Sequence, residues 1–588
     1  MSRPRALSAA VLAAAVLFAA PGARAAETPP AAPEPSAPEG LFIDRVEVNV
    51  VNLEVFVVDR DGRRVTDLGR DDFELRVDGR PVEIANFYAS RGAAAGEEAE
   101  AAFLPGAAVA GAAGAPAVAP SDPDELRERR LNLMVYVDHT FLRPGNRRRV
   151  LDHLREFLAT GLDEHTWVML VGYDGAVHVD APLTRDRETL RAGLDALGGH
   201  AGGPGPLTID RVIHVLQNTP TDAATGERLG LDQILTSFMA QEEAKLRLSV
   251  HALAESLALF AGLPGRKAVL HVSDGLPAEV MQAAQAMFAT DSSPVAGLRQ
   301  GERRLYDELV RHAQAHQIAL YPMDARGSGS EPLAGADVAM RFDPAGPVIT
   351  TAELTAMETL NRQEPLIEMA AATGGTAVLD TFDFDRALDA ISADFESFYS
   401  LGFAAPDNGD GHRHAIDVRV TRPGLRVRHR EAYVDKPLVE RVRDRTTSFL
   451  HLGMESNPMG VELALGEPER DGRRWIVPLL VRVPAAGVTL LPDAEARRGR
   501  LHFFLVVRDD RGRVSKLTHL PHPLTVPLDQ AAPDESDLGL GIHLEVRPGS
   551  WTVAVGVWDE IGGGESYVRE RVEIVEPEPP PRRGRHSR

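Results

Sequence analysis

Hydrophobic positions in the middle of this chain alternate between two patterns. Short apolar runs that suit strands buried on both faces of a sheet occur at Leu131 to Val137, Trp167 to Gly172, Ala268 to Val272, Ile318 to Met323 and Thr376 to Leu379. Between them lie amphipathic helical patterns, the clearest of which has apolar residues at Leu246, Val250, Leu253, Leu257 and Phe260. Because strand and helix patterns alternate, residues 126–395 are predicted to form a doubly wound α/β domain with a parallel sheet.

The segments on either side of this domain have the alternating pattern of half-buried strands. Residues 41–90 contain strand patterns that stop at Asp61-Gly62 and Asp78-Gly79, which are turn sequences because glycine adopts positive φ. Strand patterns return over residues 396–436. Each segment alone is too small to form a stable sheet. We therefore predict that the two pair in one β-sandwich, into which the α/β domain is inserted.

Strand patterns also fill residues 455–576, where glycine-containing turns separate them, and they predict a second, C-terminal β-sandwich. The predicted fold class is therefore multidomain, α/β plus all-β. A length of 588 residues agrees with this, because single cores rarely exceed about 250–300 residues. Three stretches lack periodicity and are predicted to be a linker at 26–40, a low-complexity insertion at 91–125 and a disordered tail at 577–588.

The first 25 residues have the pattern of a secretory signal peptide. Arg3 and Arg5 precede an apolar stretch from Ala6 to Ala20, and Ala23-Arg24-Ala25 is a cleavage sequence of the small-x-small type. The apolar stretch is shorter than the ~20 residues that a membrane span requires. We therefore predict export to the periplasm or the cell exterior, with no membrane insertion after cleavage.

Charge and cysteine content narrow the classes of function. The net charge of −22 repels phosphate backbones, so nucleic acid is not an expected partner. The chain has no cysteine, which excludes thiol catalysis and disulfides. A hydrolase would need a nucleophile paired with a base, and the sequence contains no Gly-x-Ser-x-Gly motif. We therefore expect a non-enzymatic protein.

Two of the predicted strands end in residues that can bind a cation. Asp138-His139-Thr140 follows the first strand, and Ser273-Asp274-Gly275 follows the strand at Ala268 to Val272. Open α/β sheets place ligand sites at the carboxyl ends of their strands, and carboxylate and hydroxyl oxygens suit Mg²⁺ or Ca²⁺. In the alternative interpretation, Asp138 and Asp274 only cap helices and bind loop amides. His139 is expected to be an exposed loop histidine and not a ligand.

This arrangement resembles the von Willebrand factor type A domain. The metal-ion-dependent adhesion site of that family combines an Asp-x-Ser-x-Ser run, a distant Thr and a later Asp. By this resemblance the cation ligands in the present chain are Asp138, Thr140, Thr208 and Asp274, with Thr184 as the weaker alternative to Thr208. Leu142 stands where the second Ser belongs, so the resemblance implies a weak or empty site that Leu142→Ser improves.

Further stretches are similar to bacterial secreted proteins of the VWFA-related branch. They are VVDRDGRRVTDLGRDDFELRVDGRPVEIANFY, LYPMDARG from Leu320, MAAATGGTAVL from Met369, and the segment from FYSLGF to Val434. The resemblance covers about residues 45–435 and implies a protein partner whose carboxylate completes the shell of a bound cation. We therefore predict an adhesion or scaffold protein that binds another protein at the carboxyl ends of its strands. The alternative is a structural module that has lost the metal and binds through another face.

Overall fold

The computed structural model describes residues 11–13, 50–91, 131–162, 166–202, 220, 231–280, 299–327, 339–340, 349–405, 409–454, 456–472, 474–493, 495–528 and 537–574. The chain divides into two compact units. The N-terminal unit is Val48–Pro437, and the C-terminal unit joins Met1–Glu47 to Leu438–Arg588. The predicted linker at 26–40, residues 92–125 of the predicted insertion and the predicted tail at 577–588 lie outside the described residues.

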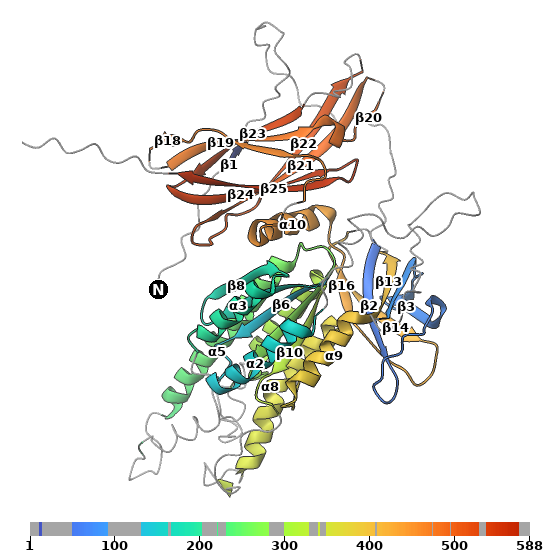
Figure 1. Ribbon diagram of the computed structural model, residues 1–588, viewed down its shortest axis with the longest axis vertical. Helices are drawn as coiled ribbons and strands as arrows, with labels where there is room; N and C mark the ends of the chain where they lie inside the picture. Colours follow the sequence, from blue (N-terminus) through green and yellow to red (C-terminus); the bar gives the residue numbers. More distant parts are fainter. Residues whose placement is uncertain are drawn as a thin grey trace, which may run out of the picture. The chain divides into compact units, whose positions relative to one another are not determined.

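A five-stranded sheet in the order β10-β9-β6-β7-β8 forms the α/β part of the N-terminal unit (Figure 1). Its strands are β6 (Leu131–Asp138), β7 (Trp167–Tyr173), β8 (Val177–Thr184), β9 (Arg266–Ser273) and β10 (Ile318–Asp324). The strands β10, β9, β6 and β7 are parallel, which confirms the predicted parallel sheet. The edge strand β8 runs antiparallel to β7.

Two features of this sheet differ from the prediction. The sequence does not predict β8, because its residues alternate between buried and partly exposed positions instead of forming an apolar run. The apolar run Thr376 to Leu379 is not a full strand, and only one parallel bridge joins Val378 to Met323. The bridge is not extended because Asp380, two residues later, has a positive φ of 50° and turns the chain away.

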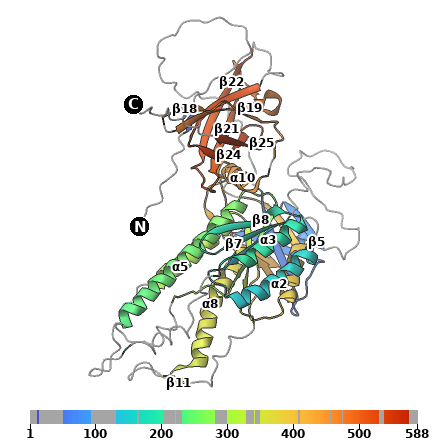
Figure 2. The same cartoon turned by 60° about the vertical axis from the view of Figure 1, so that its left-hand side comes forward.

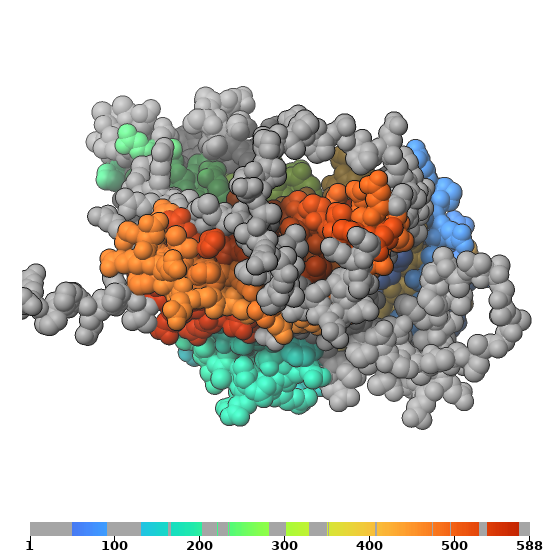
Figure 3. Space-filling model, turned by 90° about the horizontal axis from the view of Figure 1, so that it is seen from above, coloured from blue at the N-terminus to red at the C-terminus, as the bar shows by residue number. Residues whose placement is uncertain are grey.

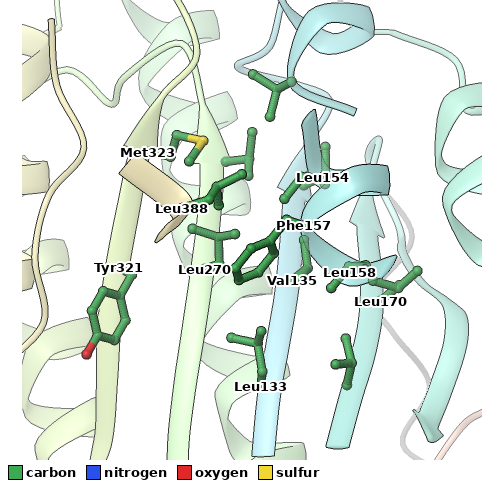
Figure 4. Close-up of a cluster of buried hydrophobic side chains, with 14 of the residues drawn as sticks. Leu133, Val135, Leu154, Phe157, Leu158, Leu170, Leu270, Tyr321, Met323 and Leu388 are labelled. Carbon is green, nitrogen blue, oxygen red and sulfur yellow. The ribbon is translucent and has the colours of Figure 1, made fainter. Parts of the chain in front are cut away.

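Helices cover both faces of the sheet, which makes it doubly wound. On one face, apolar side chains of α2, α3 and α9 form a single buried cluster with the strands (Figure 4). On the other, α5, α7 and α8 pack against one another and reach β7 and β10. The helices are α2 (Pro144–Thr160), α3 (Arg187–Gly199), α5 (Leu231–Phe260), α7 (Arg299–Ala315), α8 (Thr351–Thr373) and α9 (Phe384–Glu396). A short pair, β11 (Ala339–Met340) and β12 (Ile349–Thr350), precedes α8.

The longest of these helices, α5 and α8, extend beyond the strands (Figure 2). The ends of α8 are set by local chemistry. Thr350 and Glu353 form a reciprocal capping box at its start, and Gly374 ends it in the left-handed conformation. In the part of the chain that the structure describes, no helix combines the length and the apolar character that crossing a membrane demands.

Strands that precede the α/β part pair with strands that follow it. One sheet has the order β15-β2-β13-β5 and the other β16-β14-β3-β4. Their strands are β2 (Val50–Val58), β3 (Phe73–Val77), β4 (Arg80–Pro81), β5 (Asn86–Arg91), β13 (Ser397–Ala404), β14 (Arg413–Val420), β15 (Arg426–His429) and β16 (Ala432–Val434). Both sheets contribute to one buried cluster in which Leu53 and Leu401 are fully covered. A 3-10 turn at Arg70–Asp72 leads into β3.

The C-terminal unit contains two antiparallel sheets with a shared apolar core and is shown in orange to red in Figure 3. One sheet has the order β1-β23-β19-β17 with β18 on β19, and the other β20-β21-β24-β25 with β22 on β21. The strands are β1 (Val11–Ala13), β17 (Glu462–Leu465), β18 (Glu469–Asp471), β19 (Arg474–Pro484), β20 (Leu491–Pro492), β21 (Ala496–Asp509), β22 (Thr518–Pro527), β23 (Asp537–Val546), β24 (Gly549–Asp559) and β25 (Glu565–Ile574).

Two elements of this unit lie outside the predicted sandwich at 455–576. Helix α10 (Leu438–Leu452) packs on β21, β24 and β25, and its Phe449 stacks on Tyr567 of β25 with ring centroids 4.6 Å apart. The strand β1 falls within the predicted signal peptide and pairs with β23. Cleavage after residue 25 would therefore leave β23 as an edge strand.

Candidate functional site

Asp138 and Asp274 lie together at one edge of the parallel sheet, and we call them the strand-end pair. Asp138 is the last residue of β6, and Asp274 directly follows the neighbouring strand β9. The backbone of Phe141 joins them, because its amide donates to Asp138 Oδ1 at 3.2 Å and its carbonyl accepts from the Asp274 amide at 2.7 Å. Both side chains are fully buried.

Protein groups already bind the carboxylate oxygens of Asp138. Its Oδ1 accepts from the amides of Thr140, at 2.9 Å, and Phe141, and its Oδ2 accepts from the hydroxyl of Ser249 on α5. Burial raises the pKa of Asp138 to about 6, although these hydrogen bonds oppose the shift. Thr140 therefore serves Asp138 through its backbone amide. These contacts agree with the alternative to a cation site, in which the carboxylate of Asp138 binds the amides of a loop.

Asp274 is satisfied in the same way by residues that start α2. Its Oδ2 accepts from the Arg143 amide at 3.0 Å, and its Oδ1 accepts from the side-chain amide of Asn146 at 2.9 Å. The Arg143 guanidinium also approaches, with Nε 3.5 Å from Oδ2. Sequence reasoning missed Arg143 and Asn146, because nothing in their spacing from Asp274 marks them as its partners.

Of the remaining positions of the predicted site, the two that the structure describes, Leu142 and Thr184, supply no oxygen ligand at this edge. Leu142 is fully buried and belongs to the cluster beneath α2, so its position is part of the core. Thr184 is excluded because it pairs with Val168 at the start of β7, whereas Asp138 pairs with Tyr173 at the other end of that strand. Thr208 lies outside the described residues.

Arginines surround the strand-end pair. Arg326 forms a two-pronged pair with Asp324 at the end of β10, with Nη2 2.6 Å from Oδ2 and Nε 3.0 Å from Oδ1. Arg362 is buried and pairs with Glu358 at 2.6 Å, and burial lowers its pKa. Gly275 allows Arg362 to approach, since a Cβ there would lie 2.7 Å from the Cβ of Arg362. Because Arg326 and Arg362 are neutralised by their own carboxylate partners, Arg143 is the arginine that pairs with the strand-end pair itself.

A second polar cluster, which we call the histidine cluster, surrounds the turn between β7 and β8. It contains Asp174, His178, Asp180, His200 and His139. His178 Nε2 lies 2.9 Å from Asp174 Oδ1, and His200 connects the two carboxylates, with Nδ1 3.6 Å from Asp174 Oδ2 and Nε2 2.7 Å from Asp180 Oδ1. The ring of His178 stacks on that of His200 with centroids 4.7 Å apart.

His139 corrects the sequence-based expectation. It is fully buried, and its ring centroid lies 5.3 Å from that of His200. Its amide donates to Tyr173 O at 2.8 Å, which continues the pairing of β6 with β7 and places His139 beside Asp174. Burial lowers the pKa of His139 to about 4, so the imidazole is neutral at pH 7. The sequence concealed this cluster because its members are spread over three strand ends and the loop after α3.

Comparisons with known proteins add little to this geometry. No protein-family model matches the chain. No curated protein matches it either.

Three solved structures are similar to it at a low level. An aerotolerance-related membrane protein from Bacteroides fragilis is 12% identical over 45% of this chain and 98% of its own, with a TM-score of 0.22. BatB from Bacteroides thetaiotaomicron is 14% identical over 45% and 96%, with a TM-score of 0.21. Proximal thread matrix protein 1 from the mussel byssus, with a zinc-occupied MIDAS motif, is 12% identical over 45% and 48%, with a TM-score of 0.21. Likenesses this slight carry no argument about fold or function.

Proposed function

We propose that this chain is a non-enzymatic protein that binds a protein partner at the carboxyl-terminal edge of its parallel sheet, through Arg143 and without a required cation. The observation that carries the proposal is the state of the strand-end pair. Protein donors bind the oxygens of both carboxylates, and Arg143 stands next to Asp274 where a cation is predicted. A cation could reach the carboxylate oxygens only by displacing these donors, whereas a partner that binds Arg143 leaves them in place.

Arg143 is suited to an acidic partner. Its side chain is 39% exposed, while the Asp274 side chain beside it is fully covered. An arginine guanidinium can form two parallel hydrogen bonds to one carboxylate, which gives both affinity and orientation. We therefore propose a glutamate or aspartate of the partner as the bound group. In the family that the sequence resembles, a carboxylate of the partner binds the cation, and here the same kind of carboxylate would bind Arg143.

The serines near this edge support a binding role over a catalytic one. Ser273 is fully buried, and its hydroxyl accepts from the Gly275 amide at 3.2 Å. Ser249 is also buried and donates to Asp138. A nucleophile must reach its substrate, and neither hydroxyl is accessible.

The proposed export to the periplasm or the cell exterior rests on the sequence pattern of residues 1–25.

The second candidate function is partner binding with a weak dependence on Mg²⁺ or Ca²⁺. It is favoured by the closeness of Asp138 and Asp274, and it requires an ion to replace protein donors. A structural module that binds through another face is the remaining alternative.

Capture of partners from the exported proteins of the source cells tests the proposal. The full chain is immobilised and compared with Arg143→Glu, in the presence of Mg²⁺ and in the presence of EDTA. Arg419→Glu is the matched control, because Arg419 is also exposed and pairs with an aspartate, but on β14. We expect a protein that the wild type and Arg419→Glu retain under both conditions, and that Arg143→Glu retains at least about tenfold less. Retention by Arg143→Glu, or loss in EDTA, would contradict it.

A further inference from the structure

We propose that the histidine cluster is a binding site for a first-row transition-metal ion, with Asp174, His178 and His200 as its protein ligands. This site is separate from the strand-end pair and does not depend on the proposed binding of a partner. One ligand atom from each of the three residues lies within 4.8 Å of those from the other two. Imidazole nitrogen with one carboxylate suits Zn²⁺ and its neighbours in the series, and not Mg²⁺ or Ca²⁺.

His200 is oriented for ligation by a second carboxylate. Its Nε2 lies 2.7 Å from Asp180 Oδ1, a hydrogen-bond distance, while its Nδ1 is turned toward Asp174. A hydrogen bond from one ring nitrogen to a carboxylate fixes the tautomer in which the other nitrogen has a free lone pair, and this is the usual support of a metal-bound histidine. Asp180 is itself largely buried, so the arrangement is held within the fold.

Two buried atoms beside the cluster have hydrogen-bonding capacity that a polar ligand could use. His139 Nε2 and Asp180 Oδ2 have no hydrogen-bond partner among the residues that the structure describes. Both lie beside Gly172, since a Cβ on Gly172 would lie 3.2 Å from His139 Nε2 and 3.0 Å from Asp180 Oδ2, with Leu197 Cδ2 at 2.9 Å. Nearly all buried polar groups in native proteins are bonded, so a polar species bound at this cluster would satisfy groups that the described residues leave without a partner.

The ligands lie at the ends of regular elements and are accessible. Asp174 and His178 flank the turn of the β7–β8 hairpin, and His200 directly follows α3. Their side chains are 19%, 41% and 17% exposed, so an ion can enter from solvent. Three protein ligands leave the fourth tetrahedral position to water, and the bound ion would tie the edge hairpin to the end of α3.

Metal titration of the full chain after EDTA treatment and dialysis tests this site. The probes are Zn²⁺, Co²⁺ and Mg²⁺ alone, followed by calorimetry or by competition with a chromophoric chelator. We expect one Zn²⁺ per chain and at least about 100-fold weaker binding by His178→Ala and His200→Ala. Asp180→Asn should weaken binding by about 10–100-fold, the usual effect of removing such a support. Mg²⁺ should not compete.

Control variants locate the ion. His251→Ala removes an exposed histidine of α5 that pairs with Glu255, and it should leave Zn²⁺ affinity unchanged. Asp138→Asn should also leave it unchanged. Equal binding by wild type, His178→Ala and His200→Ala, or no Zn²⁺ binding at all, would overturn the proposal. Loss of Zn²⁺ in Asp138→Asn alone would assign the ion to the strand-end pair instead.

A spectroscopic variant removes any ambiguity from misfolding. The chain has no cysteine, so His178→Cys introduces the single thiol of the molecule. If residue 178 is a ligand, Co²⁺ bound to this variant will show a thiolate charge-transfer band that the wild type lacks. Cys substitution at 251, by His251→Cys, serves as the matched control and should show no such band. A band of equal strength in both variants, or in neither, would contradict ligation by residue 178.

Discussion

Asp138 and His139 are neighbours in the chain, yet their side chains belong to clusters of opposite character. Successive residues at a strand end point to opposite faces, so Asp138 meets Ser249 on α5 while His139 meets His200 after α3. In the strand-end pair, both oxygens of each carboxylate accept hydrogen bonds from protein donors. In the histidine cluster, two buried polar atoms have no partner among the described residues.

The contrast shows that a sequence motif and a binding site are separate properties. The strand-end pair carries the residues of a known motif, but donors from other residues already bind its carboxylate oxygens. The histidine cluster matches no motif, but it combines metal-ligand atoms with unfulfilled hydrogen-bonding capacity. A buried polar group without a partner costs about 1–3 kcal/mol, so a ligand that satisfies it would stabilise the folded state.

The largest expected effect comes from Leu142→Ser. The motif alone predicts that serine restores a cation ligand, whereas the structure places Leu142 fully within the core beneath α2. Removing a buried leucine typically costs 2–5 kcal/mol, and a buried hydroxyl adds to that, so we expect about 4 kcal/mol of lost stability. Urea unfolding of both proteins measures it. Leu142→Ala separates the loss of packing from the effect of the hydroxyl.

A gain in Mg²⁺ affinity would reverse this expectation. If Leu142→Ser unfolds at the same urea concentration as wild type and binds Mg²⁺ more tightly by calorimetry, the strand-end pair is a cation site that lacks one ligand. Equal instability of Leu142→Ser and Leu142→Ala, without Mg²⁺ binding, would instead assign position 142 to the core.

Alanine at the two aspartates distinguishes a structural carboxylate from a ligand. Asp138→Ala leaves the amides of Thr140 and Phe141 and the hydroxyl of Ser249 without their acceptor, so we expect it to lower the free energy of unfolding by about 3 kcal/mol. Asp174→Ala should cost less than about 1 kcal/mol in EDTA, because Asp174 is partly exposed and its carboxylate pairs with the histidines His178 and His200. Thermal unfolding with and without Zn²⁺ measures both.

The response to Zn²⁺ is the discriminating result of that experiment. Wild type and Asp138→Ala should both gain thermal stability when Zn²⁺ is added, because an ion that binds only the folded state stabilises it. Asp174→Ala should gain none. If Asp174→Ala is stabilised as much as wild type, the three-ligand site is wrong, and if Asp138→Ala is as stable as wild type, its hydrogen bonds are not structural.

The parallel sheet and its amphipathic helices could be predicted because, in strongly periodic segments, the spacing of the apolar residues shows which side chains are buried. Leu131 to Val137 and the helical repeat from Leu246 to Phe260 are examples, and all of these named residues are buried in α5 or β6. Half-buried elements were harder. The strand β8 and helix α10 escaped prediction. Strand β8 has no continuous apolar run, and in α10 the polar residue Thr446 occupies a buried position between Val442 and Phe449.

Only those positions in the candidate site that are fixed by the ends of strands could be predicted from the sequence. Adjacent parallel strands bring Asp138 and Asp274 to one edge whatever the side chains around them are. Their hydrogen-bond partners are not predictable in this way. Asn146 and Ser249 reach the pair only because α2 and α5 pack in a particular register. The histidine cluster likewise depends on a hairpin turn and on the length of α3, which no spacing in the sequence reveals.

The smallest expected effect is an opposite pH dependence of the two aspartates. Burial raises the folded-state pKa of Asp138 to about 6, so its ionisation opposes folding as pH rises from the unfolded value near 4 to about 6. Asp138→Asn removes that cost, and its stability relative to wild type should therefore rise between pH 4 and pH 7, by about 2–3 kcal/mol. The pKa of Asp174 is lowered through its hydrogen bond to His178, although burial opposes the shift.

The contribution of Asp174 to stability is therefore present above its unfolded pKa and lost as pH falls through the folded value. Asp174→Asn should accordingly lose stability relative to wild type as pH rises from 3 to 5, the reverse of Asp138→Asn. Urea unfolding of the three proteins at one-unit pH steps in EDTA measures both slopes. Slopes of the same sign would show that the two carboxylates share one electrostatic environment, and the distinction between the strand-end pair and the histidine cluster would then fail.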